Sequence, residues 1–139
     1  MPSKTVDAVA AQQAQSKASK KATLDLLRSK KRRTKTVELT INDEQVEFAF
    51  AALSAHDLDK LQAQHAPTAS QKLQGMAWNG DTFPPALVAA CLIEPEVSLE
   101  EMNEIWTSGE WSTGELSTLF DTASRLCMEG MDIPFSGNG

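Results

Sequence analysis

The sequence has few residues that bind metals or form disulfides. Its 139 residues include two cysteines, Cys91 and Cys127, and two histidines, His56 and His65. These four residues match no known metal-ligand spacing, so neither a metal nor another cofactor is expected. Because both cysteines stand in apolar helical surroundings, we expect buried, reduced thiols in preference to a disulfide.

Long apolar runs are also missing. A membrane-spanning helix needs about 18 or more consecutive apolar residues, and the chain contains no such run. No apolar segment follows the basic start of the chain, as a signal peptide would require. We therefore expect neither a membrane span nor a signal peptide, and a protein that stays in the cytoplasm.

The usual sequence signatures of an enzyme are absent as well. The chain has no glycine-rich phosphate loop, no cluster of His and Cys, and no serine in a nucleophile elbow. His65 has no nucleophile and orienting carboxylate near it in a recognisable arrangement, so we expect it at a helix end or on the surface. These observations predict a protein without enzymatic activity.

Positive charge is scarce outside the start of the chain. Residues 1–35 hold ten of the thirteen lysines and arginines against Asp7 and Asp25, a net charge of +8. The remainder carries three basic residues against seventeen acidic ones, a net charge of −14, and Arg125 is the only basic residue after Lys72. A basic arm therefore precedes an acidic domain.

The basic arm, residues 1–34, is rich in Ala, Gln, Ser and Lys. Such a composition predicts disorder or a marginal helix. Its candidate contacts with a partner are the basic side chains Arg28, Lys30, Lys31, Arg32 and Arg33. These side chains could bind phosphates, but no aromatic residue is interleaved with them for base stacking. We favour a solubilising or partner-docking arm over a nucleic-acid-binding one.

Residues 35–135 are predicted to form one globular domain of mainly α class with a small β-hairpin (α+β), followed by a tail at 136–139. Two runs of apolar residues alternate with polar ones, which predicts a hairpin at 36–52 with one apolar face. The apolar residues of these runs are Val37, Leu39, Ile41, Val46, Phe48 and Phe50. An isolated hairpin is only marginally stable, so it must pack this face on helices or pair an edge with another chain.

A compact bundle of about four helices is expected after the hairpin. The helix beginning at Pro84-Pro85 is apolar on every side, which predicts that it is buried. Ser98 and Ser112 are each followed three residues later by glutamate, the pattern of a capping box. The predicted helices cover about residues 54–66, 84–94, 98–108 and 112–130.

Large apolar side chains among the acidic helices are the candidates for binding a partner. Aromatic residues are enriched at the centres of interfaces, and methionine adapts to varied surfaces. Several of these residues also have a core interpretation: Trp106 lies one turn from Met102, and Trp111 is placed as a hydrophobic staple. Trp78, in a polar loop, either pins that loop to the core or contacts a partner. The candidate binding residues are Trp106, Trp111, Met102, Phe120, Met128, Met131 and Phe135.

Ordered motifs over about residues 36–135 resemble the tail assembly chaperone family of long-tailed, siphovirus-like bacteriophages. The matching segments are LDKLQAQH, DTFPPALVAACLIEPEVSLEEMNEIW and SGEWSTGELSTLFDTASRLCMEGMDIPF. The resemblance rests on four motifs in order along the chain. They are the helix that begins with FPPAL, the helix stop at Glu94-Pro95, the turn from Ile105-Trp106 to the residues GEW, and a final helix that leads into the residues DIPF. These motifs describe packing rather than a chemical site.

The resemblance implies a small, largely helical, non-enzymatic protein of the host cytoplasm. Proteins of this family bind the tape measure protein, whose long apolar helices would aggregate before the tail tube closes around them. The resemblance also leaves open contacts with the tail tube protein and with other copies of the chain. Two other classes also stay open: a tail or head-to-tail component of the virion, and a nucleic-acid-binding regulator that uses residues 28–35.

Overall fold

The computed structural model describes residues 19–130, which fall into two compact units on either side of the Lys31–Arg32 bond. The described part of the first unit contains one short helix, α2 (Leu24–Arg28), with no buried residue. Thr23 caps this helix by accepting a hydrogen bond from the Leu26 N–H at 3.1 Å. The remainder of the predicted arm (residues 1–18), the candidates Met131 and Phe135, and the 136–139 tail lie outside the described residues.

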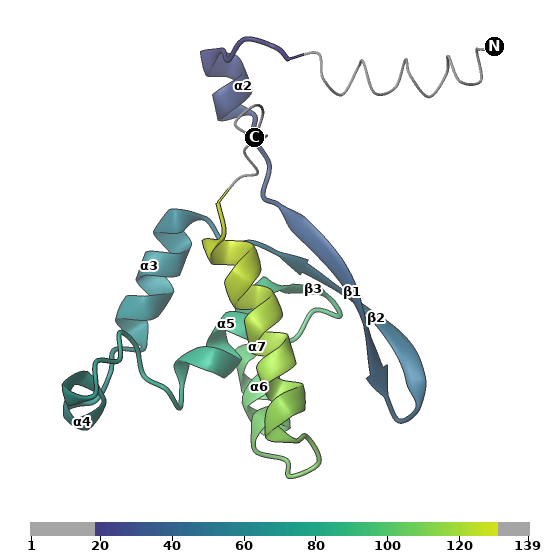
Figure 1. Cartoon of the computed structure of the whole chain (residues 1–139), viewed down its shortest axis with the longest axis vertical. Helices are drawn as coiled ribbons and strands as arrows, with labels where there is room; N and C mark the ends of the chain where they lie inside the picture. The colour runs from purple at the N-terminus through teal and green to yellow at the C-terminus, as the bar shows by residue number, and fades with distance from the viewer. Residues whose placement is uncertain (1–18, 131–139) are drawn as a thin grey trace, which may run out of the picture. The chain divides into compact units, whose positions relative to one another are not determined.

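The second unit begins at Arg32 and has the α+β architecture that the sequence predicts (Figure 1). Its strands form one antiparallel sheet in the order β1-β2-β3. In chain order its elements are β1 (Thr34–Ile41), β2 (Glu44–Ala51), α3 (Ala55–Gln64), α4 (Ala69–Leu73), α5 (Phe83–Cys91), β3 (Leu92–Glu94), α6 (Leu99–Trp106) and α7 (Thr113–Met128).

Strands β1 and β2 form the predicted hairpin. Ile41 lies opposite Glu44, so only Asn42 and Asp43 make the turn. Both turn residues have positive φ, 52° and 69°, which is the conformation of the tight turns whose twist matches paired strands. The apolar face of the hairpin packs inward, with Phe50 fully buried.

The predicted helix at 84–94 is wrong at its carboxyl end. Helix α5 stops at Cys91, and the next three residues form β3, which pairs antiparallel with β2 through Phe50 opposite Leu92. Pro95 disfavours helical geometry for the residue before it, and β2 offers an unpaired edge in this position. Pairing with β2 therefore replaces the last helical turn.

The polar loop around Trp78, residues 67–82, contains a further short helix, α4. Thr68 and Gln71 form its capping box, with the Gln71 N–H donating to Thr68 Oγ1 and the Thr68 N–H donating to Gln71 Oε1. The loop returns to the core through Trp78, whose ring centroid lies 4.8 Å from that of Phe83. Trp78 thus pins the loop to the core, one of its two predicted roles.

Both predicted capping boxes on α6 and α7 are confirmed. Ser98 Oγ accepts from the Glu101 N–H at 3.0 Å, and Ser112 Oγ accepts from the Glu115 N–H at 3.1 Å. In return, the Ser98 N–H donates to the Glu101 side chain, and this bond to the charged form lowers the pKa of Glu101. These local hydrogen bonds set where each helix begins.

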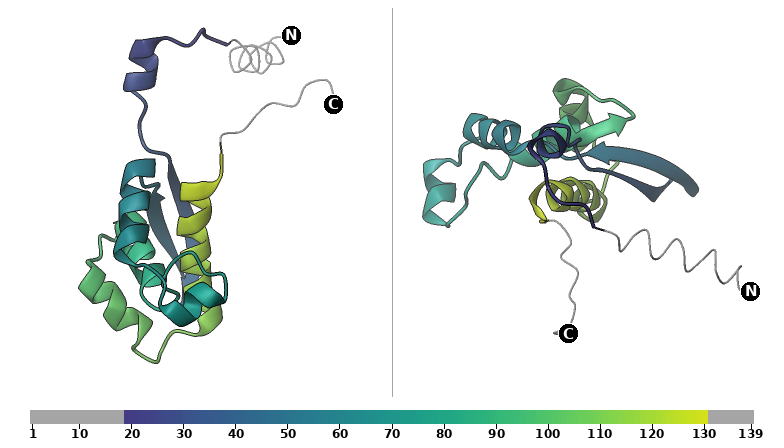
Figure 2. Two further views of the ribbon diagram at one scale, coloured as in Figure 1. Left: turned by 90° about the vertical axis from the view of Figure 1, so that its left-hand side faces the viewer. Right: turned by 90° about the horizontal axis from the view of Figure 1, so that it is seen from above.

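Helix α5 is the centre of the core, as its apolar sequence predicts. Its side chains Phe83, Leu87, Val88 and Cys91 are fully buried. The helix contacts α3, α6 and α7, and α7 also runs beside the hairpin and contacts β2 (Figure 2). The sheet and the helices therefore share one core around α5.

The substitution Leu87→Ala should lower the free energy of unfolding by about 2–5 kcal/mol, because it removes buried methyl groups and leaves a cavity. Chemical denaturation measures this change. Leu73→Ala is the matched control: Leu73 is 90% exposed, and its truncation should change stability by no more than about 0.5 kcal/mol. Equal losses for the two variants would contradict the central position of α5.

Candidate functional site

A groove lies between the start of α5, the end of α6 and the first half of α7. We call it the aromatic groove, and its volume is about 240 Å³. Trp106 is the last residue of α6, Phe120 comes from α7, and Pro84 comes from the first turn of α5. The groove is lined by Pro84, Trp106, Thr113, Leu116, Ser117 and Phe120. The sequence-predicted candidates Trp106 and Phe120 thus meet at one place.

Phe120 is held in the groove by an aromatic cluster. Its ring lies edge-on to Trp78, with centroids 5.6 Å apart, and edge-on to Phe83, with centroids 6.2 Å apart. Edge-to-face packing of this kind stabilises a ring in one orientation. Because Phe83 is fully buried, one side of the groove is rigid and supported by the core. The sequence did not show this support, which joins three separate segments.

Of the other predicted binding residues that the structure describes, none lines the aromatic groove. Met102 is only 2% exposed and belongs to the core, so its prediction as a client-binding residue is wrong. Trp111 is half-buried and packs against the core. Met128 is exposed, but it is eight residues beyond Phe120 on α7, about 12 Å along the helix axis. Met131 and Phe135 lie outside the described residues.

The surface of α6 and α7 is acidic. Their exposed carboxylates are those of Glu100, Glu101, Glu104, Glu115 and Asp121. Within these two helices the only basic side chain is that of Arg125. The aromatic groove is therefore an apolar depression on helices that present a predominantly negative surface, a combination suited to binding an apolar segment while remaining in solution.

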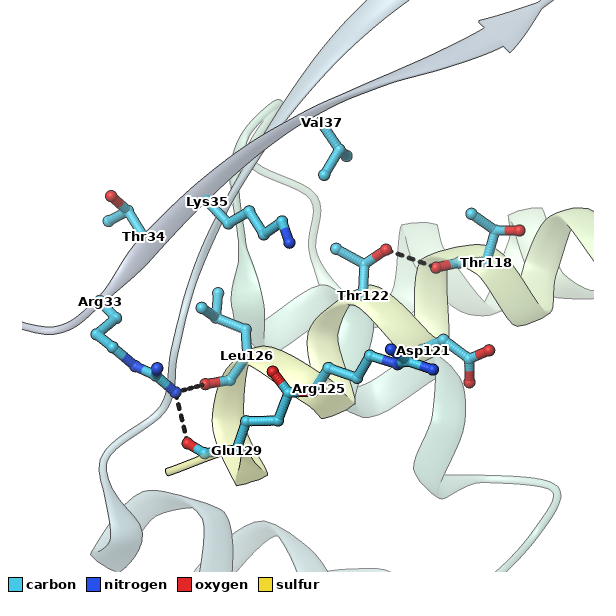
Figure 3. A pocket seen from close by; sticks show the side chains of 10 residues that line it. All are labelled: Arg33, Thr34, Lys35, Val37, Thr118, Asp121, Thr122, Arg125, Leu126 and Glu129. Carbon is cyan, nitrogen blue, oxygen red and sulfur yellow. Dashed lines mark hydrogen bonds between the residues drawn. The ribbon is translucent and has the colours of Figure 1, made fainter. Parts of the chain in front are cut away.

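A second groove, of about 620 Å³, separates β1 from α7 (Figure 3). We call it the β1–α7 groove. Its sheet side carries Arg33, Thr34, Lys35 and Val37, and its helix side carries Thr118, Asp121, Thr122, Arg125, Leu126 and Glu129. This groove could not be predicted from the sequence, because it depends on where α7 lies relative to the sheet. Its lining is mixed, with charges of both signs and few apolar side chains.

Arg33 joins the two sides of the β1–α7 groove. Its Nη2 donates to the backbone carbonyls of Leu126 and Glu129, both at 2.7 Å (Figure 3). Carbonyls at the end of a helix have no partner within the helix, and a cation is favoured there by the helix dipole. Arg33 therefore caps the carboxyl end of α7.

Arg32 is used in the same way, as a donor to the carbonyls of Ala51 and Ala52 at the end of β2. Both arginines were predicted to belong to a partner-binding arm, and the structure corrects this: their guanidinium groups bind the protein's own backbone. Of the other predicted contacts, Arg28, Lys30 and Lys31 belong to the first unit and are exposed. The arm available to partners is therefore shorter than the sequence suggested.

The two cysteines are free thiols with their Sγ atoms 3.5 Å apart. Cys91 is fully buried as expected, whereas Cys127 is half-buried and accepts a hydrogen bond from the Leu53 N–H at 3.3 Å. The hydrogen bond from Cys91 lowers the pKa of Cys127, with help from Leu53 and the nearby arginines. The same pairing and its burial raise the pKa of Cys91. The pair thus loses its first proton from Cys127.

Few other side chains in the described range 19–130 are candidates for catalysis or metal binding. His65 is the C-cap of α3, and its Nδ1 lies 2.9 Å from Thr82 Oγ1, so it has the helix-end position predicted for it. Within that range, no three His, Cys, Asp or Glu side chains gather in a way that could hold a metal ion. Nor is any helix of this part long and apolar enough to cross a membrane.

Arg33→Ala should lower the free energy of unfolding by about 1–3 kcal/mol, because charge-assisted hydrogen bonds to the end of α7 are lost. Chemical denaturation gives the total change, and hydrogen exchange should show faster opening of the last turn of α7. Arg125→Ala on the same helix is the control and should be close to neutral. A neutral Arg33→Ala would show that the cap does not contribute.

In the native protein, Cys127 should react with iodoacetamide at a lower pH than an ordinary thiol, because its pKa is lowered, while Cys91 should remain unreactive. Mass spectrometry of tryptic peptides measures each site across a pH series. Cys91→Ala removes the hydrogen bond that favours the thiolate and should move the reaction of Cys127 to higher pH. In urea both thiols should react alike. Equal reaction of Cys91 and Cys127 in the native protein would contradict the lowered pKa of Cys127.

Comparison with known proteins gives no relative from which a role could be transferred. No family model matches the chain, and neither a curated protein nor a solved structure matches it. Its function therefore has to be inferred from its own residues and their geometry.

Proposed function

We propose that this chain is a tail assembly chaperone of a long-tailed bacteriophage, a non-enzymatic protein of the host cytoplasm. It binds the tape measure protein and keeps it soluble until the tail tube closes around it. The observation that carries the proposal is the aromatic groove, where Trp106 and Phe120 line a depression between helices with an acidic surface. The resemblance of residues 36–135 to that family supplies the identity of the client.

The aromatic groove and the acidic surface around it suit the task of covering an apolar client helix. A client with an exposed apolar helical stripe can place one or more of its side chains in a groove lined by aromatic residues, which removes apolar surface from water. The aromatic groove is small, so it holds one point of such a stripe rather than a whole helix. The surrounding carboxylates keep the complex charged and soluble.

The structure gives less support to a nucleic-acid-binding regulator. Two of the five candidate phosphate contacts, Arg32 and Arg33, bind backbone carbonyls of their own unit. The remainder of the chain beyond residue 35 carries a net charge of −14, which repels phosphates. Protein partners are therefore favoured for the arm as well.

A structural component of the virion is the second candidate. The observation that favours it is the position of β1 at the edge of the sheet, where a neighbouring subunit could add a strand. Quantitative mass spectrometry of finished particles separates the two candidates. A fixed copy number in the particle would favour the virion component, whereas an assembly chaperone should be absent from it.

Co-expression with the tape measure protein of the same phage tests the proposal. Ser117 is exposed on the rim of the aromatic groove, so Ser117→Arg should block the groove without disturbing the core. We expect the parent chain to keep the tape measure protein soluble and to co-purify with it. Ser117→Arg should weaken the affinity about tenfold or more, a loss of ~1.4 kcal/mol, and so lower the amount of complex recovered.

Asn103→Arg is the matched control for this experiment, since Asn103 is an exposed residue of α6 that does not line the groove. It adds the same charge and should preserve the complex. A tape measure protein that remains insoluble with the parent chain would contradict the chaperone proposal. Equal losses of complex for both arginine variants would show that the client does not bind at the aromatic groove.

A further inference from the structure

Strand β1 has one free edge. It is the first strand in the sheet order β1-β2-β3, so β2 pairs with only one of its sides. Within the described residues 19–130, no other strand pairs with the outer side. The strand is eight residues long, and such an edge presents a row of unpaired backbone donors and acceptors.

The residues with outward backbone groups can be identified. The Ala52 N–H donates to the Arg33 carbonyl at 2.8 Å, which makes Arg33 and Ala52 a hydrogen-bonded pair in register with the hairpin. In an antiparallel ladder such pairs recur at every second residue. Odd-numbered residues of β1 therefore bond to β2. The residues whose N–H and C=O point outward are Thr34, Thr36, Glu38 and Thr40.

The edge lacks the usual features that prevent strand addition. Natural edge strands are protected by proline, bulges, several charges or a covering segment. Strand β1 contains no proline, pairs with β2 without a bulge, and has Lys35 and Glu38 as its only charged side chains. All four residues with outward backbone groups have exposed side chains.

There is also room for a further strand. The β1–α7 groove lies beside this edge on the apolar face of the sheet, and Lys35 and Val37 of β1 form part of its lining (Figure 3). Helix α7 contacts the sheet at β2. A strand added to β1 would therefore place its inward side chains in or beside the groove rather than against the helix.

We propose that the outer edge of β1 binds β1 of a second copy of this chain, antiparallel, about a two-fold axis at Val37. In this register Val37 faces Val37 of the other copy, and Leu39 faces Lys35, all on the apolar side of the sheet. Thr36 faces Glu38 on the other side. The two three-stranded sheets then form one continuous six-stranded sheet.

The neighbouring registers are less favourable. An axis at Glu38 would place the two Glu38 carboxylates directly opposite each other, although Glu38 already faces Glu47 within the hairpin. Like charges in this position are destabilising. An axis at Thr36 would set Lys35 against Val37 and leave Leu39 and Ile41 without partners. Shifting the register by a single residue would put apolar side chains on the polar face.

A second copy is the occupant that this edge fits. An added strand must alternate apolar and polar residues in phase with β1 and must bring opposite or neutral groups to Lys35 and Glu38. Strand β1 meets both conditions when paired with itself, and a self-complementary patch produces a closed two-fold dimer. This inference is independent of the proposed chaperone function, since it uses the edge of β1 and not the aromatic groove.

Disulfide trapping tests both the contact and its register. Val37 bonds to β2, so the Val37 pair across the axis is a non-hydrogen-bonded pair with Cα atoms about 4.5 Å apart, within disulfide range. In Val37→Cys, oxidised glutathione should take up the two thiol hydrogens and two electrons, giving one intermolecular disulfide and two molecules of reduced glutathione. A dimer sensitive to dithiothreitol should form.

Leu39→Cys is the matched control. Two Leu39 residues would lie about 13 Å apart along the strands in this register, so this variant should form at least tenfold less disulfide-linked dimer. The parent chain, with Cys91 and Cys127 only, sets the background. Equal yields from Val37→Cys and Leu39→Cys, or a yield from Val37→Cys no higher than the parent, would overturn the register.

Charge changes at Thr36 test the contact without a cross-link. Thr36→Lys places a cation opposite Glu38 of the other copy and should increase dimerisation, whereas Thr36→Glu should decrease it. Sedimentation velocity over a concentration series measures the shift from the 15.1 kDa monomer toward twice that mass. At concentrations low enough for all the chains to be monomeric, both Thr36 variants should keep the parent's unfolding temperature. A parent chain that stays monomeric at all concentrations, or two variants with the same dimerisation, would overturn the proposal.

Discussion

Helix α5 has no polar side, and the arrangement of the other elements follows from the need to enclose it. Phe83, Leu87 and Val88 are fully buried, and a helix with this sequence would be unstable in contact with water. The hairpin and α7 contribute apolar faces to the core around it, while α3 and α6 also contact it. Near its end only Ala90 is exposed, and at its beginning Pro84 remains accessible, where the aromatic groove lies.

The features that could be predicted from the sequence are those set by nearby residues. The starts of α6 and α7 follow from Ser98 and Ser112, because a capping box needs only residues three positions apart. Strand β3 could not be predicted, since the sequence after Cys91 becomes a strand only because β2 offers an edge to pair with. The capping box of α4 was present in the sequence at Thr68 and Gln71, but that helix buries no residue and so has no apolar pattern.

Prediction of the candidate site from the sequence has the same limit, since only features set by nearby residues can be predicted. Periodicity identifies the residues of a helix that face inward, but not which of them another element covers. Met102 and Trp106 lie one turn apart on α6, yet Met102 is enclosed and Trp106 lines a groove. Arg33 was grouped with its basic neighbours in the sequence, and only the position of the end of α7 gives it a structural role. Both differences arise from contacts between segments far apart in the chain.

Helix α7 connects the two surfaces without making them compete. Leu116 and Phe120 face the aromatic groove, whereas Thr118, Thr122 and Leu126 face the β1–α7 groove. Pairing of β1 strands would therefore leave the aromatic groove of each copy open. A dimer would present two such grooves to one client, and binding at the second would become intramolecular after the first is occupied. Each groove is small and binds one apolar point of a long client helix. Two grooves that bind successive apolar points of the same helix would together hold it more tightly than one groove alone.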